Sequence, residues 1–327
     1  MAYALLPVGN LAQNSPMPSS LAEPDAAAEF EAERPHLLAV AYRMIGSRAE
    51  AEDAVQEAWL RYAKVRSGGE IHDLRGWLTT VTGRICLDLL KSARVRRETY
   101  PGQWLPSVFV EEESDPARHA ELSDQVGLAL LVVLERLTPQ QRVSVVLHDA
   151  FGMPFADVAT VLNTTESAAR QHASRGRRAV AEGGRRLAPR LPGGHHRADA
   201  AGQRRVLTAF LDAAGSGDVR ALAAVLAPQV VAIGDGGGRF PVAARPIEGA
   251  ERVARFAVAI FRGRRLDTST VTVEPVLVNG EPGLLGRGKW RDGRPLLAVV
   301  GVAVADGLIT GIFNQMNPDK ILLGDLL

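Results

Sequence analysis

The chain has 327 residues, which is too long for one ordinary domain, so we expect two or three domains. Its net charge of +1, with 46% hydrophobic and 23% charged residues, is that of a globular protein and indicates no particular partner. The single cysteine, Cys86, excludes an internal disulfide and a thiolate metal cluster and fits a cytoplasmic location, and no apolar run is long enough to span a membrane.

Residues 1–27 are predicted to form a mobile tail. Their opening stretch is rich in Pro, Ser and Asn and lacks the basic start and the apolar core of a signal peptide.

Residues 28–98 are predicted to form a helical domain. Ser47 and Glu50 make a capping box at the start of its second helix, which gathers apolar residues in one stripe and turns acidic residues outward. The next helix, "LRGWLTTVTGRICLDLLKSARVRR", becomes basic toward its C-terminal end. The helix dipole favours cations there, so part of that basic character is structural.

Residues 99–124 are predicted to be a linker, because they contain three prolines and a cluster of acids. Trp104, Leu105 and the apolar run at 108–110 are too hydrophobic for a solvated tether. We therefore expect part of the linker to dock on another part of the chain.

Residues 125–188 return to a helical pattern and carry a helix-turn-helix signal. A short helix begins after Pro154, "NTT" makes a turn, and Thr165 is placed to cap a third helix. That helix has small residues on one face and a polar, basic face opposite: Arg170, Gln171, Ser174, Arg175, Arg177 and Arg178. Arginine reads guanine, glutamine reads adenine and further arginines contact phosphate, so this face suits a DNA major groove. The alternative is a packing unit with a solvated basic face.

Residues 189–202 form a second predicted linker, and residues 203–327 a domain of a different texture. Two helical stretches precede a strand near residues 229–234, and a helix follows at 249–262. Valine-rich alternating segments then follow one another, separated by one Asn-Gly and two Asp-Gly turns. This pattern predicts an α+β fold with a meander-like antiparallel sheet.

The stretch "GDGGGRFP" admits three functional interpretations and one without a function. It lacks the Lys-Ser/Thr pair of a phosphate-binding P-loop and the helix that follows a dinucleotide fingerprint, so nucleotide binding is disfavoured. Catalysis is disfavoured because residues 197–327 contain no His, Tyr or Cys to complete an acid–base site. The remaining interpretation is a contact loop, in which three glycines let a partner approach the backbone and the flanking Asp235 and Arg239 form charge pairs. The alternative is a tight glycine turn that has no regulatory role.

The order of these motifs resembles the extracytoplasmic-function sigma factors of the sigma-70 family over roughly residues 28–182. "AEDAVQEAW" resembles their polymerase-binding helix, the basic helix resembles the segment that reads the minus-ten element, and the helix-turn-helix resembles the domain that reads the minus-thirty-five element. The resemblance implies three sets of residues. The polymerase-binding set is Asp53, Gln56, Glu57 and Trp59. The minus-ten set is Trp77, Arg84, Lys91, Arg94, Arg96 and Arg97. The minus-thirty-five set is Thr165 with the six polar residues of the third helix.

The last third resembles the subfamily with a fused C-terminal SnoaL-like (NTF2-like) domain, which regulates the sigma factor in place of a separate anti-sigma protein. Its three motifs stand here as "WLP", "DGGGR" and "NPDK". The implied regulatory interface contains Trp104, Leu105, Pro106, Asp235, Gly236, Gly237, Gly238, Arg239, Asn317, Pro318, Asp319 and Lys320. The chain reads "WLPSVF" where the family linker continues W-L-P-E-P, so the contact there can differ. We expect substitution of Asp235 or Arg239 to alter transcription without lowering stability.

The resemblance implies a sigma factor without enzymatic activity, cofactor or metal, whose partners are the β and β′ subunits of core RNA polymerase and promoter DNA. It leaves open a small ligand in the pocket of the C-terminal domain. One alternative is a DNA-recruited protein whose SnoaL-like domain senses a ligand or has enzyme-like activity. Another is a helix-turn-helix repressor, which would not need the polymerase-binding helix.

Overall fold

The computed structural model describes residues 26–66, 71–112, 126–187, 200–262 and 266–324. Most of the predicted tail (1–27) and parts of both predicted linkers (113–124 and 189–199) lie outside the described residues.

Three helices build the N-terminal part: α1 (Ala26–Ile45), α2 (Arg48–Arg66) and α3 (Leu74–Glu98). Between α1 and α2 the chain turns at Gly46, whose φ of 74° is left-handed. The Ser47 hydroxyl then accepts a hydrogen bond from the Glu50 amide at 3.4 Å, which caps α2 as the sequence predicts.

The second helical part has four α-helices and one π-helical turn: α5 (Leu128–Leu134), α6 (Pro139–Val145), η2 (Val146–Ala150), α7 (Phe155–Leu162) and α8 (Glu166–Leu187). A capping box between Thr138 and Gln141 starts α6, and left-handed Asn163 ends α7. Gly176 lets α8 cross α6 closely, because a Cβ there would lie 2.6 Å from Val145 Cγ2.

The C-terminal part places three helices beside a long sheet. Its helices are α9 (Ala200–Ser216), α10 (Val219–Ala224) and α11 (Ala250–Phe261), with a short 3-10 helix, η3 (Pro318–Lys320). Its strands are β2 (Leu226–Asp235), β3 (Ile247–Glu248), β4 (Leu266–Val278), β5 (Glu281–Trp290), β6 (Pro295–Ala305), β7 (Leu308–Gln315) and β8 (Ile321–Leu323). The Asn279-Gly280 and Asp306-Gly307 turns have positive φ at both residues, as a tight hairpin requires.

The predicted α+β class and the β4–β7 meander are confirmed, but the sheet is mixed rather than antiparallel. Its eight strands run in the order β3-β2-β7-β6-β5-β4-β1-β8. β2 pairs in parallel with β7. A parallel pair needs a long connection between its strands, and here the connection contains α11 and the strands β4–β6.

One strand of this sheet comes from the predicted linker. β1 (Val108–Glu111) pairs antiparallel with β4 and parallel with β8. The apolar linker therefore docks by entering the sheet of the C-terminal domain.

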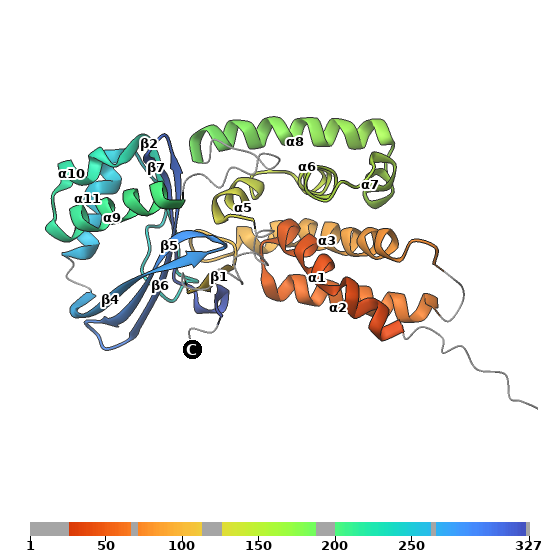
Figure 1. Cartoon of the computed structure of the whole chain (residues 1–327), viewed down its shortest axis with the longest axis horizontal. Helices are drawn as coiled ribbons and strands as arrows, with labels where there is room; N and C mark the ends of the chain where they lie inside the picture. Colours follow the sequence, from red (N-terminus) through yellow and green to blue (C-terminus); the bar gives the residue numbers. More distant parts are fainter. Residues whose placement is uncertain (1–25, 67–70, 113–125, 188–199, 263–265, 325–327) are drawn as a thin grey trace, which may run out of the picture.

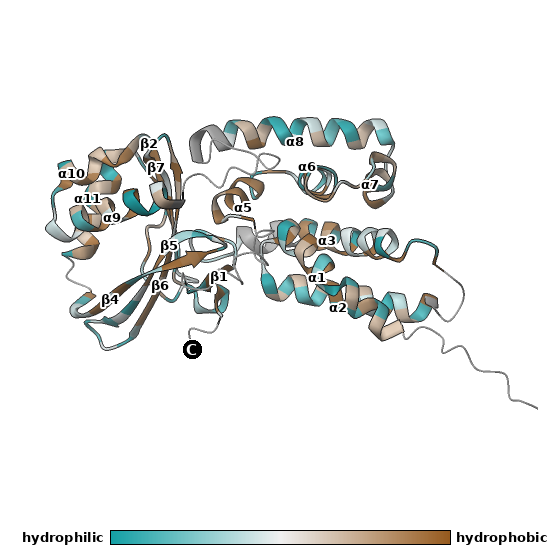
Figure 2. Cartoon of the chain, in the orientation of Figure 1, coloured by the Kyte–Doolittle hydropathy of each residue, from teal (hydrophilic) through white to brown (hydrophobic). Residues whose placement is uncertain are grey.

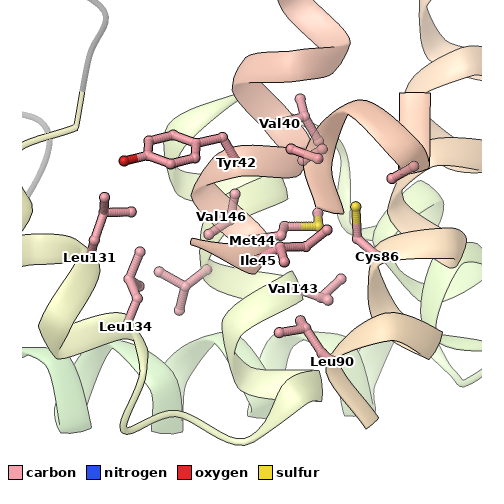
Figure 3. Packing of buried hydrophobic residues seen from close by; sticks show 14 of the residues in the cluster. Val40, Tyr42, Met44, Ile45, Cys86, Leu90, Leu131, Leu134, Val143 and Val146 are labelled. Atoms are coloured by element: carbon pink, nitrogen blue, oxygen red, sulfur yellow. The ribbon is translucent and has the colours of Figure 1, made fainter. Parts of the chain in front are cut away.

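The two helical parts lie side by side against one face of the sheet, while α9, α10 and α11 cover the other face (Figure 1). The helix between the sheet and the helical parts, α5, is hydrophobic along its whole length (Figure 2). One core runs through both helical parts, so that Val40 and Ile45 of α1 and Cys86 of α3 pack with Val143 of α6 and Leu131 of α5 (Figure 3). The two helical parts are thus packed together as one body.

Candidate regulatory and nucleic-acid interfaces

The carboxylate of Asp235 lies at the end of β2, fully buried where the C-terminal domain meets the linker. Its Oδ1 accepts hydrogen bonds from the Tyr100 hydroxyl at 2.7 Å and the Gly237 amide at 2.9 Å. Its Oδ2 accepts from the Leu105 amide at 3.0 Å and from Lys320 Nζ at 2.7 Å. Four donors, two of them from the linker, thus satisfy a charge that would be costly to bury alone.

Lys320 ties the end of the chain to the same linker residues. Its Nζ donates to the Leu105 carbonyl at 3.0 Å and lies 4.4 Å from the ring centre of Tyr100 and 4.3 Å from that of Trp104. Aromatic faces attract cations, so the ammonium is held by Asp235 on one side and by linker groups on the other. Burial and the neighbouring Asp235 raise the pKa of the Tyr100 phenol, so its hydroxyl stays protonated and donates.

The glycines after Asp235 press the backbone against two other segments. Gly237 and Gly238 have φ of 59° and 72°, which side chains rarely adopt. A Cβ on Gly237 would lie 2.6 Å from Asn317 Cγ, and one on Gly238 would lie 2.7 Å from Pro101 Cγ. The glycine loop is therefore a close-contact surface toward both the "NPDK" turn and the linker.

The "NPDK" turn is only partly exposed. Asn317 is buried and donates to the Tyr100 hydroxyl at 3.0 Å. Pro318 and Asp319 are exposed, and Asp319 forms an ion pair with Arg239 at the surface. Arg239 thus pairs within its own domain, whereas Asp235 reaches the linker.

A second set of contacts joins the linker to both α1 and the sheet. Gln315 Nε2 donates to the Pro106 carbonyl at 3.0 Å, and the Tyr42 hydroxyl donates to the Ser107 carbonyl at 2.6 Å. Asn279 Nδ2 donates to the Tyr42 hydroxyl at 2.9 Å. Ser107, where the chain departs from the family linker motif, therefore lies at the junction of three parts of the molecule.

The two helical parts also contact each other directly. The Arg84 guanidinium of α3 donates from Nη2 to the Thr160 carbonyl of α7 at 2.9 Å. A Cβ on Gly83 would lie 3.2 Å from Val161 Cγ1, which shows how closely α3 and α7 approach. Arg84 is therefore engaged with the helix-turn-helix rather than free for a minus-ten element.

His36 of α1 is held neutral at the same contact. Thr79 Oγ1 donates to the Arg75 carbonyl, so His36 Nε2–H donates to Thr79 at 3.1 Å while Nδ1 accepts from Arg75 at 3.0 Å. The ring meets Phe151 of the helix-turn-helix edge-on at 5.3 Å. Burial, with Arg75 and Arg43 nearby, lowers the pKa of His36 to about 4.

Acidification should therefore destabilise the protein through His36. The unfolded ring has a pKa near 6.5, so the unfolded state binds the proton first, and this contribution is present above pH 6.5 and lost as pH falls toward 4. Because the ring is only half buried, we expect a loss of about 1 kcal/mol in the free energy of unfolding between pH 7 and pH 5. Urea titrations of the wild type and His36→Gln at both pH values measure it. An equal pH dependence in the two proteins would contradict the assignment.

The recognition-helix residues share one exposed face of α8. Thr165 Oγ1 accepts from the Ala168 amide at 3.2 Å and so caps the helix. Arg170 pairs with Glu166 and lies 4.8 Å from the ring centre of Phe155, and Arg177 pairs with Asp149 at 2.8 Å. The exposed members of the set without an ion pair in the described part of the chain are Gln171, Ser174, Arg175 and Arg178.

Three of the six minus-ten residues, Trp77, Arg84 and Lys91, have side chains that the structure describes. Trp77 is half buried and packs 6.1 Å from the Tyr62 ring, and Lys91 pairs with Asp88 at 3.1 Å. Arg94, Arg96 and Arg97 lie in the last turns of α3, and their side chains are outside the described part of the structure.

The polymerase-binding residues are mostly on the outer face of α2. Asp53 and Gln56 are exposed, and Glu57 pairs with Arg61 at 2.9 Å. Trp59 is half buried, with its ring centre 5.1 Å from that of Phe30, so it also has a packing role. The exposed Leu60 of the same helix was not in the predicted set. Its position directly after Trp59 in the sequence could have indicated that it belongs to the same surface.

Sequence reasoning also missed the polar residues that hold the linker. Tyr100, Gln315 and Asn279 each bond across more than 130 residues of chain. Asn279 was predicted only as a turn residue, yet its Oδ1 also accepts from the Phe109 amide at 2.9 Å. A turn signal gives no information on what else the side chain contacts.

The described residues show neither a metal-binding cluster nor a membrane-spanning helix. These residues contain no cluster of three or more His, Cys, Asp or Glu side chains that could hold a metal ion. Across the described ranges, no helix combines the length and the apolar character needed to cross a membrane.

Three protein families match successive parts of the chain. "Sigma-70 region 2" matches residues 30–96, "Sigma-70, region 4" matches residues 127–180, and "SnoaL-like domain" matches residues 207–312. Each match falls on one of the three structural parts described above.

Two curated relatives from Mycobacterium tuberculosis are similar over most of their length. The ECF RNA polymerase sigma factor SigJ of strain H37Rv is 42% identical over 89% of this chain and 92% of its own. The probable ECF RNA polymerase sigma factor SigI is 36% identical over 90% of this chain and 94% of its own. The crystal structure of M. tuberculosis SigJ is similar to this structure over 90% of this chain and 97% of the SigJ chain, with 37% sequence identity and a TM-score of 0.69.

Proposed function

Because the chain belongs to the extracytoplasmic-function sigma factors of the sigma-70 family that carry a C-terminal SnoaL-like domain, we propose that its own SnoaL-like domain regulates it in cis. As a member of this family it is a sigma factor that directs core RNA polymerase to promoters and initiates transcription. The single observation that carries the proposal is the docked linker: Tyr100 and Leu105 bond to the buried Asp235, and β1 is a strand of the C-terminal sheet.

The docked linker has a mechanical consequence for the helical parts. It connects α3 to α5, and its described residues, 99–112, are held to the C-terminal domain through Asp235 and through β1. The separation of the two DNA-binding parts is therefore set by the C-terminal domain rather than by a free tether. In this arrangement α3 and α7 touch, so the sheet holds a closed form of the protein.

We assign the outer face of α2 to core polymerase. Asp53, Gln56 and Glu57 supply polar contacts there, and Leu60, which is 49% exposed, supplies an apolar one. Exposed apolar side chains beside polar groups are typical of a docking surface. The β and β′ subunits remain the proposed partners, in the cytoplasm, without a separate anti-sigma protein.

We assign the exposed face of α8 to the minus-thirty-five element. Arg175→Ala and Arg178→Ala should each lower promoter affinity about fivefold to a hundredfold, since each removes an arginine that can reach a base edge or a phosphate. Binding titrations over a range of salt concentrations distinguish a base contact from a phosphate contact. Loss of a phosphate contact reduces the slope of log affinity against log salt concentration by about 1. Arg255→Ala on α11 is the matched control. Affinities equal to that of the control would remove these arginines from the interface.

The proposal is tested by transcription with purified core polymerase. Tyr100→Phe removes the hydroxyl that bonds Asp235 and Asn317 and leaves the surfaces assigned to polymerase and DNA unchanged. Arg255→Ala, which breaks only an exposed ion pair with Glu251 on α11, is its control. A several-fold change in initiation for Tyr100→Phe alone supports regulation through the linker, and its sign tells whether docking inhibits or activates. Rates equal to wild type at equal polymerase occupancy would refute it.

A further inference from the structure

A hollow of about 530 Å³ lies beside the glycine loop and shares Gly238 and Arg239 with it. Its walls are the loop at 238–241 and the turn at 290–294 that joins β5 to β6. The volume falls in the range of sites that hold small molecules. The question is which chemistry its walls would accept.

The rim of the hollow is cationic. Arg239, Arg291 and Arg294 line it together with one carboxylate, Asp292. Arg294 pairs with Asp292 at 2.8 Å, whereas Arg291 donates only Nε–H, to the Leu266 carbonyl at 3.2 Å, among the described residues. Its remaining guanidinium N–H groups are available to a ligand, and such groups bind carboxylates and phosphates in a planar, two-pronged geometry.

The inner wall of the hollow is aromatic. The rings of Phe240 and Trp290 are stacked with their centres 6.4 Å apart, and the Arg294 guanidinium lies 6.0 Å from the centre of Phe240. Trp290 is 7% exposed, and its indole Nε1 has no hydrogen-bond partner within the described part of the chain. A buried donor without an acceptor is unfavourable, so a ligand whose binding shifts the Trp290 ring enough to expose Nε1 would gain by supplying an acceptor.

We propose that this hollow binds a small organic anion, in which a carboxylate or phosphate is attached to a flat ring. The anionic group meets Arg291 at the rim, and the ring lies against Phe240 and Trp290. A flat ring suits this wall because both aromatic faces and guanidinium planes stack on rings.

The site shares Gly238 with the linker contact. The Arg239 carbonyl accepts from Arg294 Nη1 at 3.1 Å, and the preceding Gly238 lies against Pro101 of the linker. A ligand that displaces Arg294 or Arg239 would therefore shift the loop on which the linker rests. This regulatory consequence rests on the proposed control in cis, but binding at the site does not.

The test titrates the full-length protein with 8-anilinonaphthalene-1-sulfonate, a fluorescent flat-ring anion. We expect Arg291→Ala to weaken binding of this probe at least fivefold and Trp290→Phe to weaken it severalfold, with Arg255→Ala unchanged. Circular dichroism shows whether each variant is folded. If Arg291→Ala does not fold, Trp290→Phe still tests the site, because phenylalanine keeps an aromatic ring in the wall of the hollow. Equal binding by all four proteins would overturn the site.

Competition then defines the ligand chemistry. Benzoate and phenyl phosphate should displace the probe, and the stronger of the two identifies the anionic group. Displacement by benzyl alcohol at the same concentrations would show that the ligand needs no anionic group. Equal displacement by inorganic phosphate would show that the ligand needs no ring. These measurements involve no transcription, so their failure leaves the proposed function intact, and failure of the Tyr100→Phe transcription test leaves the site intact.

Discussion

Replacing Asp235 with alanine should lower the free energy of unfolding by about 3–5 kcal/mol, because it leaves the Lys320 ammonium buried without its counter-charge. It also removes the acceptor of the Tyr100 hydroxyl and the Leu105 amide, so the linker should detach from the glycine loop. Urea denaturation measures the first effect. Amide hydrogen exchange measures the second, as faster exchange in residues 100–107.

A double-mutant cycle isolates the buried pair. Asp235→Ala with Lys320→Met removes both charges, so it should be less destabilised than the sum of the two single variants. Arg239→Ala breaks an ion pair that lies at the surface, and it should cost less than about 1 kcal/mol. If the free energy of unfolding of Asp235→Ala is no lower than that of Arg239→Ala, the Asp235 carboxylate does not hold the linker.

This result would also revise the expectation drawn from the sequence. The sequence placed Asp235 and Arg239 as equivalent charges on either side of the glycines, with substitutions that leave stability unchanged. The structure separates them, since Asp235 is fully buried and Arg239 is mostly exposed. Only Arg239 still fits the expectation, because exposed ion pairs contribute little.

The helices and the β4–β7 meander could be predicted because their signals are local. The cap at Ser47, the cap at Thr165 and the Asn-Gly and Asp-Gly turns each act within a few residues. The strand β1 could not be assigned in this way. Its four residues acquire strand structure only by pairing with β4 and β8, which lie more than 150 residues away.

The candidate site was predictable in part for the same reason. The motifs at Trp104, Asp235 and Asn317 could be named from the resemblance, and the structure brings those segments together. Their polarity alone could not say which side chain is buried. Arg142 shows the limit most clearly: it reads as a surface residue of α6, yet it is 2% exposed and paired with Glu135 inside the body formed by both helical parts.

The contact between α3 and α7 should be incompatible with promoter binding. The positions that name the minus-ten and minus-thirty-five elements differ by about 25 base pairs, which is about 85 Å of duplex at 3.4 Å per base pair. The parts assigned to these two elements are in direct hydrogen-bond contact here, through Arg84 and the Thr160 carbonyl. The protein must therefore open along this contact before both parts can reach DNA.

A disulfide across the contact should block transcription reversibly. A Cβ on Gly83 would lie 3.2 and 3.5 Å from the two γ-methyl groups of Val161, so Gly83→Cys with Val161→Cys places two thiols within bonding reach. We expect the oxidised double variant to lose at least tenfold in promoter-directed transcription with core polymerase, and a reductant to restore it. The native Cys86 should not interfere, since it is buried and burial raises the pKa of its thiol.

Each single cysteine variant, oxidised in the same way, controls for effects of the substitution and of the oxidant. Full activity of the cross-linked double variant would mean that the two parts need not separate, and the closed contact would then have no bearing on initiation. A block in the double variant alone would show that opening precedes promoter recognition. In that case the C-terminal domain acts by setting how readily the contact opens, because it holds the described part of the linker after α3 through Asp235 and β1.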